Sequence, residues 1–149
     1  MSLPPFHLAF PVHDLAEARA FWCGVMGCPE GRSAANWIDF DFHGHQIVAH
    51  RIEGMVAPDA GTNPVDGHEV PVPHFGLVLP IPEWHALTER LHAARITFVI
   101  EPHVRFAGQA GEQASMFFRD PSGNAVEIKA FADPSQLFAT DQSNSPLIK

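Results

Sequence analysis

Two histidines and one glutamate occupy matching positions in strand-like segments, where together they could bind a metal ion. His7 and His74 each begin a segment of alternating apolar and polar residues, and each is followed on the same face by a small residue, Ala9 or Gly76. Glu127 lies in a third such segment whose other face is apolar, so its carboxylate needs a cationic partner. Two imidazoles and one carboxylate fill one face of an octahedral metal and leave positions open for substrate. The set suits Fe(II), Mn(II), Zn(II) or Ni(II).

The elements that must position these residues can be predicted from the periodicity of the chain. Asp14 and Glu17 form a capping box that predicts a helix ending near Gly24, and Pro82 suits the first turn of a second helix that continues to Ala94. Alternation predicts strands at residues 6–10, 37–42, 46–50, 74–79, 96–100, 115–119 and 125–131. Residues 101–113 are expected to form a loop. The order of elements predicts an α+β fold of two tandem βαβββ modules.

The expected boundaries follow changes in composition. The first module is predicted at residues 1–55 and the second at 72–132. Residues 56–71, rich in Gly, Pro, Asp and Asn, are interpreted as a linker or ordered loop, and residues 133–149 as a polar tail.

His7, His74 and the string from Asp120 to Glu127 (DPSGNAVE) resemble the vicinal oxygen chelate superfamily of glyoxalases, bleomycin resistance proteins and extradiol dioxygenases. The resemblance covers residues 6–131. It implies that the two modules form a curved mixed sheet around a metal or ligand cavity. In the metal-binding members, the ligands come from the first strand of each module and the last strand of the second, and these positions correspond to His7, His74 and Glu127.

Two positions depart from the enzymes of the superfamily. Glyoxalase-type members use a fourth ligand from the last strand of the first module, where this chain has Val48. His50, on the same face, is a candidate substitute ligand, a candidate acid/base catalyst as in extradiol dioxygenases, or a surface residue. Extradiol enzymes place a tyrosine where this chain has Phe117, and the chain contains no tyrosine. His103 or a histidine from the loop that contains His68 would then have to donate the hydrogen bond to the substrate.

The resemblance leaves three functions open. The leading hypothesis is an extradiol-type dioxygenase with Fe(II) on the three ligands, which acts on a small molecule with vicinal oxygens and uses His50 as acid/base. The second is a glyoxalase- or epimerase-like lyase or isomerase, in which Zn, Mn or Ni is a possible metal. The third is a bleomycin-resistance-like binding protein, against which the intact ligand set argues.

Composition excludes several other classes of protein. The 149 residues carry a formal net charge of −8, so nucleic acid is not an expected partner. No apolar run has membrane-spanning length, and the first residues lack the features of a signal peptide, which favours a cytoplasmic protein. Cys23 and Cys28 form no disulfide framework and are expected to be reduced.

Open sheet edges and the family resemblance both predict a homodimer.

Overall fold

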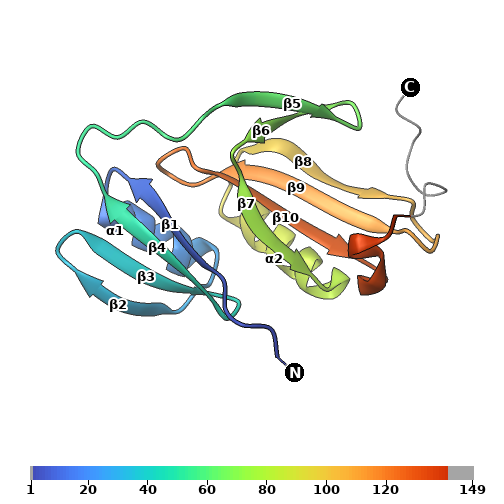
Figure 1. The fold of residues 1–149 in the computed structure, drawn as a ribbon, viewed down its shortest axis with the longest axis horizontal. Helices are drawn as coiled ribbons and strands as arrows, with labels where there is room; N and C mark the ends of the chain where they lie inside the picture. Colours follow the sequence, from blue (N-terminus) through green and yellow to red (C-terminus); the bar gives the residue numbers. More distant parts are fainter. Residues whose placement is uncertain (1, 141–149) are drawn as a thin grey trace.

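Two four-stranded mixed sheets, one from each half of the chain, lie side by side in a computed structural model that describes residues 2–140 (Figure 1). The first half contains β1 (His7–Val12), α1 (Leu15–Arg19), the π-helix η1 (Ala20–Val25), β2 (Glu30–Ala34), β3 (Trp37–Phe42) and β4 (His45–Arg51). The second half contains β7 (Phe75–Leu79), α2 (Ile81–Ala93), β8 (Phe98–Arg105), β9 (Gln113–Arg119), β10 (Ala125–Phe131) and the 3-10 helix η2 (Pro134–Phe138). The strand orders are β1-β4-β3-β2 and β7-β10-β9-β8. The predicted α+β fold of tandem βαβββ modules is confirmed.

The two modules repeat the same strand register. In the first, β1 and β4 pair in parallel and place Ala9 opposite Val48. In the second, β7 and β10 pair in parallel and place Gly76 opposite Glu127. Val48 is therefore the counterpart of Glu127, as the sequence alignment of the modules predicts.

The helices form where their caps and apolar stripes predict. The Asp14 carboxylate accepts a hydrogen bond from the backbone N–H of Glu17 (2.8 Å) and caps α1, which continues directly into η1. In the second module, α2 packs on its sheet, and the buried Trp84 Nε1–H donates to the carbonyl of Ile128 (3.0 Å). No helix within residues 2–140 has the length and apolar character needed to cross a membrane.

The larger hydrophobic cluster joins the modules through aromatic contacts. The ring of Phe75, on β7, lies 5.4 Å from that of Phe10 on β1 and stacks 5.9 Å from that of the fully buried Trp22. Pairs of this geometry add about 0.5–1.5 kcal/mol beyond the apolar area that they bury. Each module therefore depends on the other to cover its aromatic side chains.

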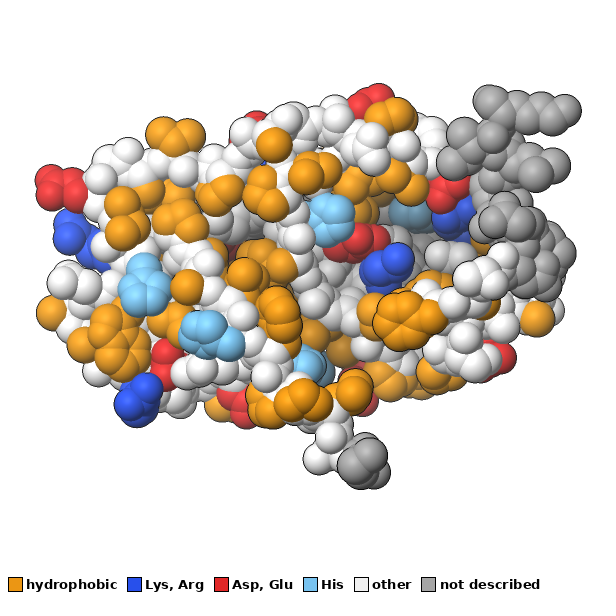
Figure 2. Space-filling model, viewed as in Figure 1, with side chains coloured by type: hydrophobic (Ala, Val, Ile, Leu, Met, Phe, Trp, Pro, Cys, Tyr) orange, Lys and Arg blue, Asp and Glu red, His pale blue; other side chains and the backbone are white. Residues whose placement is uncertain are grey.

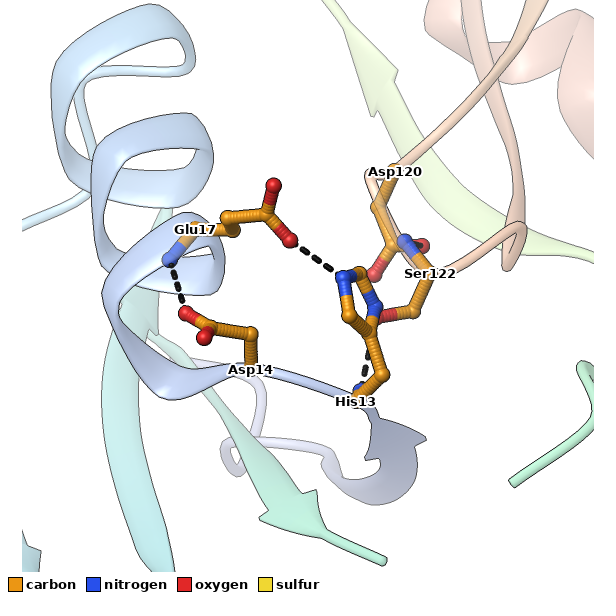
Figure 3. Close-up of polar contacts among 5 residues, drawn as sticks. All are labelled: His13, Asp14, Glu17, Asp120 and Ser122. Carbon is orange, nitrogen blue, oxygen red and sulfur yellow. Dashed lines mark hydrogen bonds and ion pairs between the residues drawn. The ribbon is translucent and has the colours of Figure 1, made fainter. Parts of the chain in front are cut away.

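Polar contacts also connect the modules at the β9–β10 turn (Figure 3). The Ser122 hydroxyl oxygen accepts from the backbone N–H of His13 (3.0 Å) and lies 2.8 Å from the Nδ1 atom of the same residue. His13 Nε2 forms an ion pair with Glu17 when the imidazole is protonated. Beside this contact, the Asn124 amide donates to the carbonyl of Pro11 (2.8 Å). The end of β1 is thus attached to the start of β10.

Three segments differ from the expectations. The segment interpreted as a linker, residues 56–71, contains most of an antiparallel hairpin of β5 (Gly61–Val65) and β6 (His68–Val72). The expected loop at residues 101–113 begins as strand, because β8 continues to Arg105 along the edge of its sheet. The polar tail starts with η2, and residues 141–149 lie outside the described part of the chain.

Candidate metal centre

The side chains of His74 and Glu127 meet at one end of the second sheet. His74 Nε2 lies 3.1 Å from Glu127 Oε2, and the exposed fractions of the two side chains are 29% and 16%. The Ser115 hydroxyl donates to Glu127 Oε1 (2.9 Å), which orients the carboxylate. On the other side of the imidazole, His74 Nδ1 lies 2.7 Å from the carbonyl oxygen of Pro71.

These contacts determine which nitrogen of His74 is free to bind a metal. A carbonyl oxygen only accepts hydrogen bonds, so Nδ1 must carry a hydrogen, and a neutral ring then has its lone pair on Nε2. That lone pair faces the Glu127 carboxylate, which is also an acceptor, so a proton or a metal cation must lie between them. A hydrogen bond from Nδ1–H to a carbonyl oxygen is a usual support of a histidine that binds a metal through Nε2. These two residues could contribute two donors to a divalent metal site.

His7 is prepared in the same way on the first sheet. Its Nδ1 lies 2.8 Å from the Gln46 side-chain oxygen, and the Gln46 amide nitrogen donates to Asp39 Oδ2 (3.1 Å). The Asp39 carboxylate can only accept, so it holds the Gln46 oxygen toward His7. The residue Asp39 is only 7% exposed, which keeps this chain of hydrogen bonds in place. His7 Nδ1 therefore carries hydrogen, and Nε2 is free.

Within one chain, the structure does not bring His7 to the other two candidate ligands. Across residues 2–140, no group of three or more His, Cys, Asp or Glu side chains is arranged to hold a metal ion. β1 and β7 run in opposite directions (Figure 1), and Pro11 at the far end of β1 contacts Asn124. At about 3.3 Å per residue, His7 lies roughly 13 Å back along β1 from this contact.

A cavity of about 330 Å³ opens beside His74 and Glu127. Strands β8, β9 and β10 form its floor, and the β5–β6 hairpin forms the facing wall. Figure 2 shows histidine, acidic and basic side chains gathered in a hollow on the half of the molecule that the second module occupies. The polar and charged lining residues are Asp66, His68, His74, His103, Arg105, Gln113, Ser115, Glu127 and Lys129.

Phe117 replaces the tyrosine of the extradiol enzymes and has a packing function. The residue is 4% exposed, and its ring meets the His74 imidazole edge to face with 5.0 Å between the ring centres. It fixes the plane of the imidazole but has no hydroxyl to donate.

His50 lies outside this cavity. It is exposed on β4, opposite Pro11 on one side and Trp37 on the other.

Ser115 and Lys129 belong to the site but did not stand out in the sequence. Both lie on the cavity side of their strands, and they face each other in the register of β9 and β10. Lys129 is two residues after Glu127, so the period-2 pattern already placed it on the same face. Ser115 could be found only by pairing the strands.

The contact between Ser122, His13 and Glu17 has the composition of a hydrolase triad but lacks its other parts (Figure 3). The backbone N–H groups of Ser122 and Asn124 donate to the Asp120 carboxylate, and that of Gly123 donates to the Asp120 carbonyl. They are therefore not free to stabilise an oxyanion. Burial raises the pKa of the Asp120 carboxyl, and its hydrogen bonds from Asn124 and Ser122 offset part of this increase. We interpret the contact as a structural link between the modules.

Comparison with known proteins gives the family. No curated protein sequence matches the chain significantly. A glyoxalase/bleomycin resistance protein/dioxygenase from Alicyclobacillus acidocaldarius is 29% identical over 91% of this chain and 96% of its own, with a TM-score of 0.69. A genomically encoded fosfomycin resistance protein from Listeria monocytogenes is 20% identical over 92% of this chain and 100% of its own, with a TM-score of 0.61.

A lactoylglutathione lyase from Agrobacterium tumefaciens is 22% identical over 87% of this chain and 94% of its own, with a TM-score of 0.61. The family model of the Glyoxalase/Bleomycin resistance protein/Dioxygenase superfamily matches residues 5–128. The chain belongs to this superfamily.

Proposed function

We propose that the chain is a metal-dependent enzyme that binds a small molecule through two neighbouring oxygen atoms and catalyses proton transfer on it, as lyases and isomerases do. The observation that carries the proposal is the free Nε2 atom of His74 facing the Glu127 carboxylate beside a polar cavity. A bound divalent metal, with Fe(II), Zn, Mn and Ni as candidates, would polarise substrate oxygens as a Lewis acid. The cavity residues would orient the substrate and move its protons.

The third ligand in this proposal is the partner subunit's His7. His7 is exposed at the start of β1, and its Nε2 atom is free. A twofold dimer would place each His7 against the His74 and Glu127 pair of the other chain and so build two equal sites.

The experiment measures bound metal in single variants and in their mixture. His7→Ala and His74→Ala should each reduce bound metal from one per chain to near zero, whereas His85→Ala, on the exposed face of α2, should leave it unchanged. Unfolding and refolding His7→Ala together with His74→Ala should restore roughly a quarter of the sites, because half of the dimers are mixed and each contains one intact site.

Two results would contradict this design. Full metal binding by His7→Ala would exclude His7 as a ligand. No recovery in the refolded mixture, with dimers present by sedimentation, would exclude a site shared between chains.

An extradiol-type dioxygenase is the second candidate, because the proposed site would have three protein ligands. Val48, the counterpart of Glu127, has no donor atom, so no fourth ligand comes from that position. Three ligands would leave positions open for both substrate and oxygen, as Fe(II) oxygenases require. Oxygen consumption by the Fe(II)-loaded protein with a catechol would favour the dioxygenase, and substrate turnover without oxygen consumption would favour the lyase or isomerase.

A further inference from the structure

A row of polar side chains crosses the cavity floor next to the candidate metal ligands. His103 on β8 pairs with Ser115 on β9, which pairs in turn with Lys129 on β10. All three line the cavity. Lys129 is two residues from Glu127 on the same strand, so the row lies about 7 Å from that carboxylate along the sheet. A small molecule bound at His74 and Glu127 would extend over this row.

His103 is held in one tautomer and faces a second imidazole. Its Nδ1 atom lies 2.9 Å from the carbonyl oxygen of Glu101, so Nδ1 carries hydrogen and a neutral ring has its lone pair on Nε2. The ring of His68, from the β5–β6 hairpin, is 5.0 Å away at a tilt of 33°. Floor and wall of the cavity thus each contribute one imidazole at the same point.

The charged groups around this histidine pair already have partners of their own. Asp66 on the hairpin forms an ion pair with Arg105 on β8, and Glu127 faces His74. Lys129 lies over the ring of Phe131. Among residues 2–140, neither His68 nor His103 forms an ion pair with a carboxylate, so both imidazoles remain available to a ligand.

We propose that His103, supported by His68, is the group that accepts a proton from the bound substrate. The inference rests on the proposed function and adds its substrate class, a weakly acidic molecule with vicinal oxygens that carries at least one hydroxyl group. The substrate O–H bond breaks, its electron pair stays on oxygen, and the proton forms an N–H bond at His103 Nε2. The resulting imidazolium then hands the proton back at a later step, so no oxidant or reductant is needed.

Imidazoles are the side chains beside the candidate ligands that could accept this proton. Phe117 offers no hydroxyl, and its ring is already committed to His74. Histidine is the side chain that most often acts as a general base in enzymes.

The experiment uses 4-nitrocatechol, whose absorbance reports its ionisation, as a probe of the zinc-loaded dimer. Its binding is measured by titration, and the protons released are counted by calorimetry in buffers of different ionisation enthalpy. Wild type should release roughly one proton fewer than His103→Gln, because in wild type the imidazole retains it. His103→Gln should also bind the probe roughly tenfold more weakly. Zinc content should be unchanged.

His68→Gln provides a second variant, on the exposed hairpin. The matched control is His92→Gln, because His92 lies on α2 and its ring packs on Phe98. His68→Gln should move the proton count in the same direction by a smaller amount, and His92→Gln should not move it. If zinc-loaded wild type binds the probe but both cavity variants release the same number of protons as wild type, the proton-acceptor inference is wrong. If wild type binds neither zinc nor probe, the proposed function itself fails.

Discussion

The two modules present equivalent imidazoles but support them with different partners. In the first module, His7 is oriented by the side chain of Gln46, which the buried Asp39 holds in turn. In the second, His74 is oriented by a backbone carbonyl, that of Pro71. Both arrangements leave Nε2 free. A substitution cannot remove the backbone carbonyl that orients His74, but it can remove the side chain that orients His7. The importance of orienting a candidate ligand can therefore be tested in the first module.

The modules also differ at the small residue of their first strand that pairs with their last strand. Ala9 lies opposite Val48, and Gly76 lies opposite Glu127. A Cβ atom at Gly76 would overlap the carbonyl oxygen of Glu127, so the backbones of β7 and β10 approach closely at the candidate ligand. The first module accommodates a methyl group at its equivalent position.

The largest expected effect comes from Gly76→Ala. The new methyl group would force β7 and β10 apart and should lower the free energy of unfolding by about 3 kcal/mol or more. The matched change Ala9→Gly should cost about 1 kcal/mol, from backbone entropy and lost contacts. Urea unfolding followed by circular dichroism measures both. Equal costs would show that the close approach is not specific to the second module.

Gln46→Leu should weaken metal binding without unfolding the chain. Removal of a group that orients a metal-ligating histidine costs about 10–100-fold in affinity. Competition with a chromophoric chelator would measure the affinity. Gln109→Leu, in the exposed loop after β8, is the control and should have no effect. An unchanged affinity in Gln46→Leu would mean that His7 needs no support or is not a ligand.

The turns of the two modules also differ. The β9–β10 turn packs against the first module, whereas the turn at His43 and Gly44 is exposed. A substitution in the β9–β10 turn is expected to have a smaller effect than the two changes above. The pKa of Asp120 is raised by burial, so the folded state favours the protonated carboxyl. This contribution to stability is fully present below the unfolded pKa, about 3.9, and is lost as pH rises through the folded value. Asp120→Asn should remove this part of the pH dependence.

The measurement is the urea concentration at the midpoint of unfolding, determined at several pH values from about 3 to about 7. This range extends from below to above the ordinary pKa of an aspartate. Asp133→Asn is the contrasting variant. Hydrogen bonds from Ser135 lower the pKa of Asp133, so its contribution is present above the unfolded pKa and is lost as pH falls through the folded one. Identical pH profiles for wild type and Asp120→Asn would contradict the assignment.

His50→Phe should have the smallest effect of these changes. His50 is four residues beyond Gln46 on β4, which puts it roughly 13 Å further along the sheet. We therefore expect neither metal content nor turnover to change. Loss of turnover with metal retained would restore the acid/base function predicted from the sequence, and loss of both would make His50 a ligand.

Local patterns predicted most of the elements, and the failures have identifiable causes. The alternation in β1, β3 and β10 survives because each of these strands has a buried face. The β5–β6 hairpin was missed although Asp66 and Gly67 form a typical turn pair, because prolines interrupt both strands. Pro102 similarly obscured the second half of β8, an edge strand that tolerates it.

Sequence reasoning predicted the components of the site but not how the modules would arrange them. The alternation assigned His74 and Glu127 to one face of paired strands, and the structure brings them together. The distance of His7 from them depends on the antiparallel placement of β1 and β7, which no local pattern records.

The aromatic contact between Trp22, Phe10 and Phe75 should make the two modules unfold together. Because the first module covers the aromatic side chains of the second, neither can detach without exposing Trp22 to water. Tryptophan fluorescence and hydrogen exchange in both sheets should therefore report one transition at one denaturant concentration. A protease that cuts the connection near the β5–β6 hairpin should leave two fragments that remain associated until that same transition.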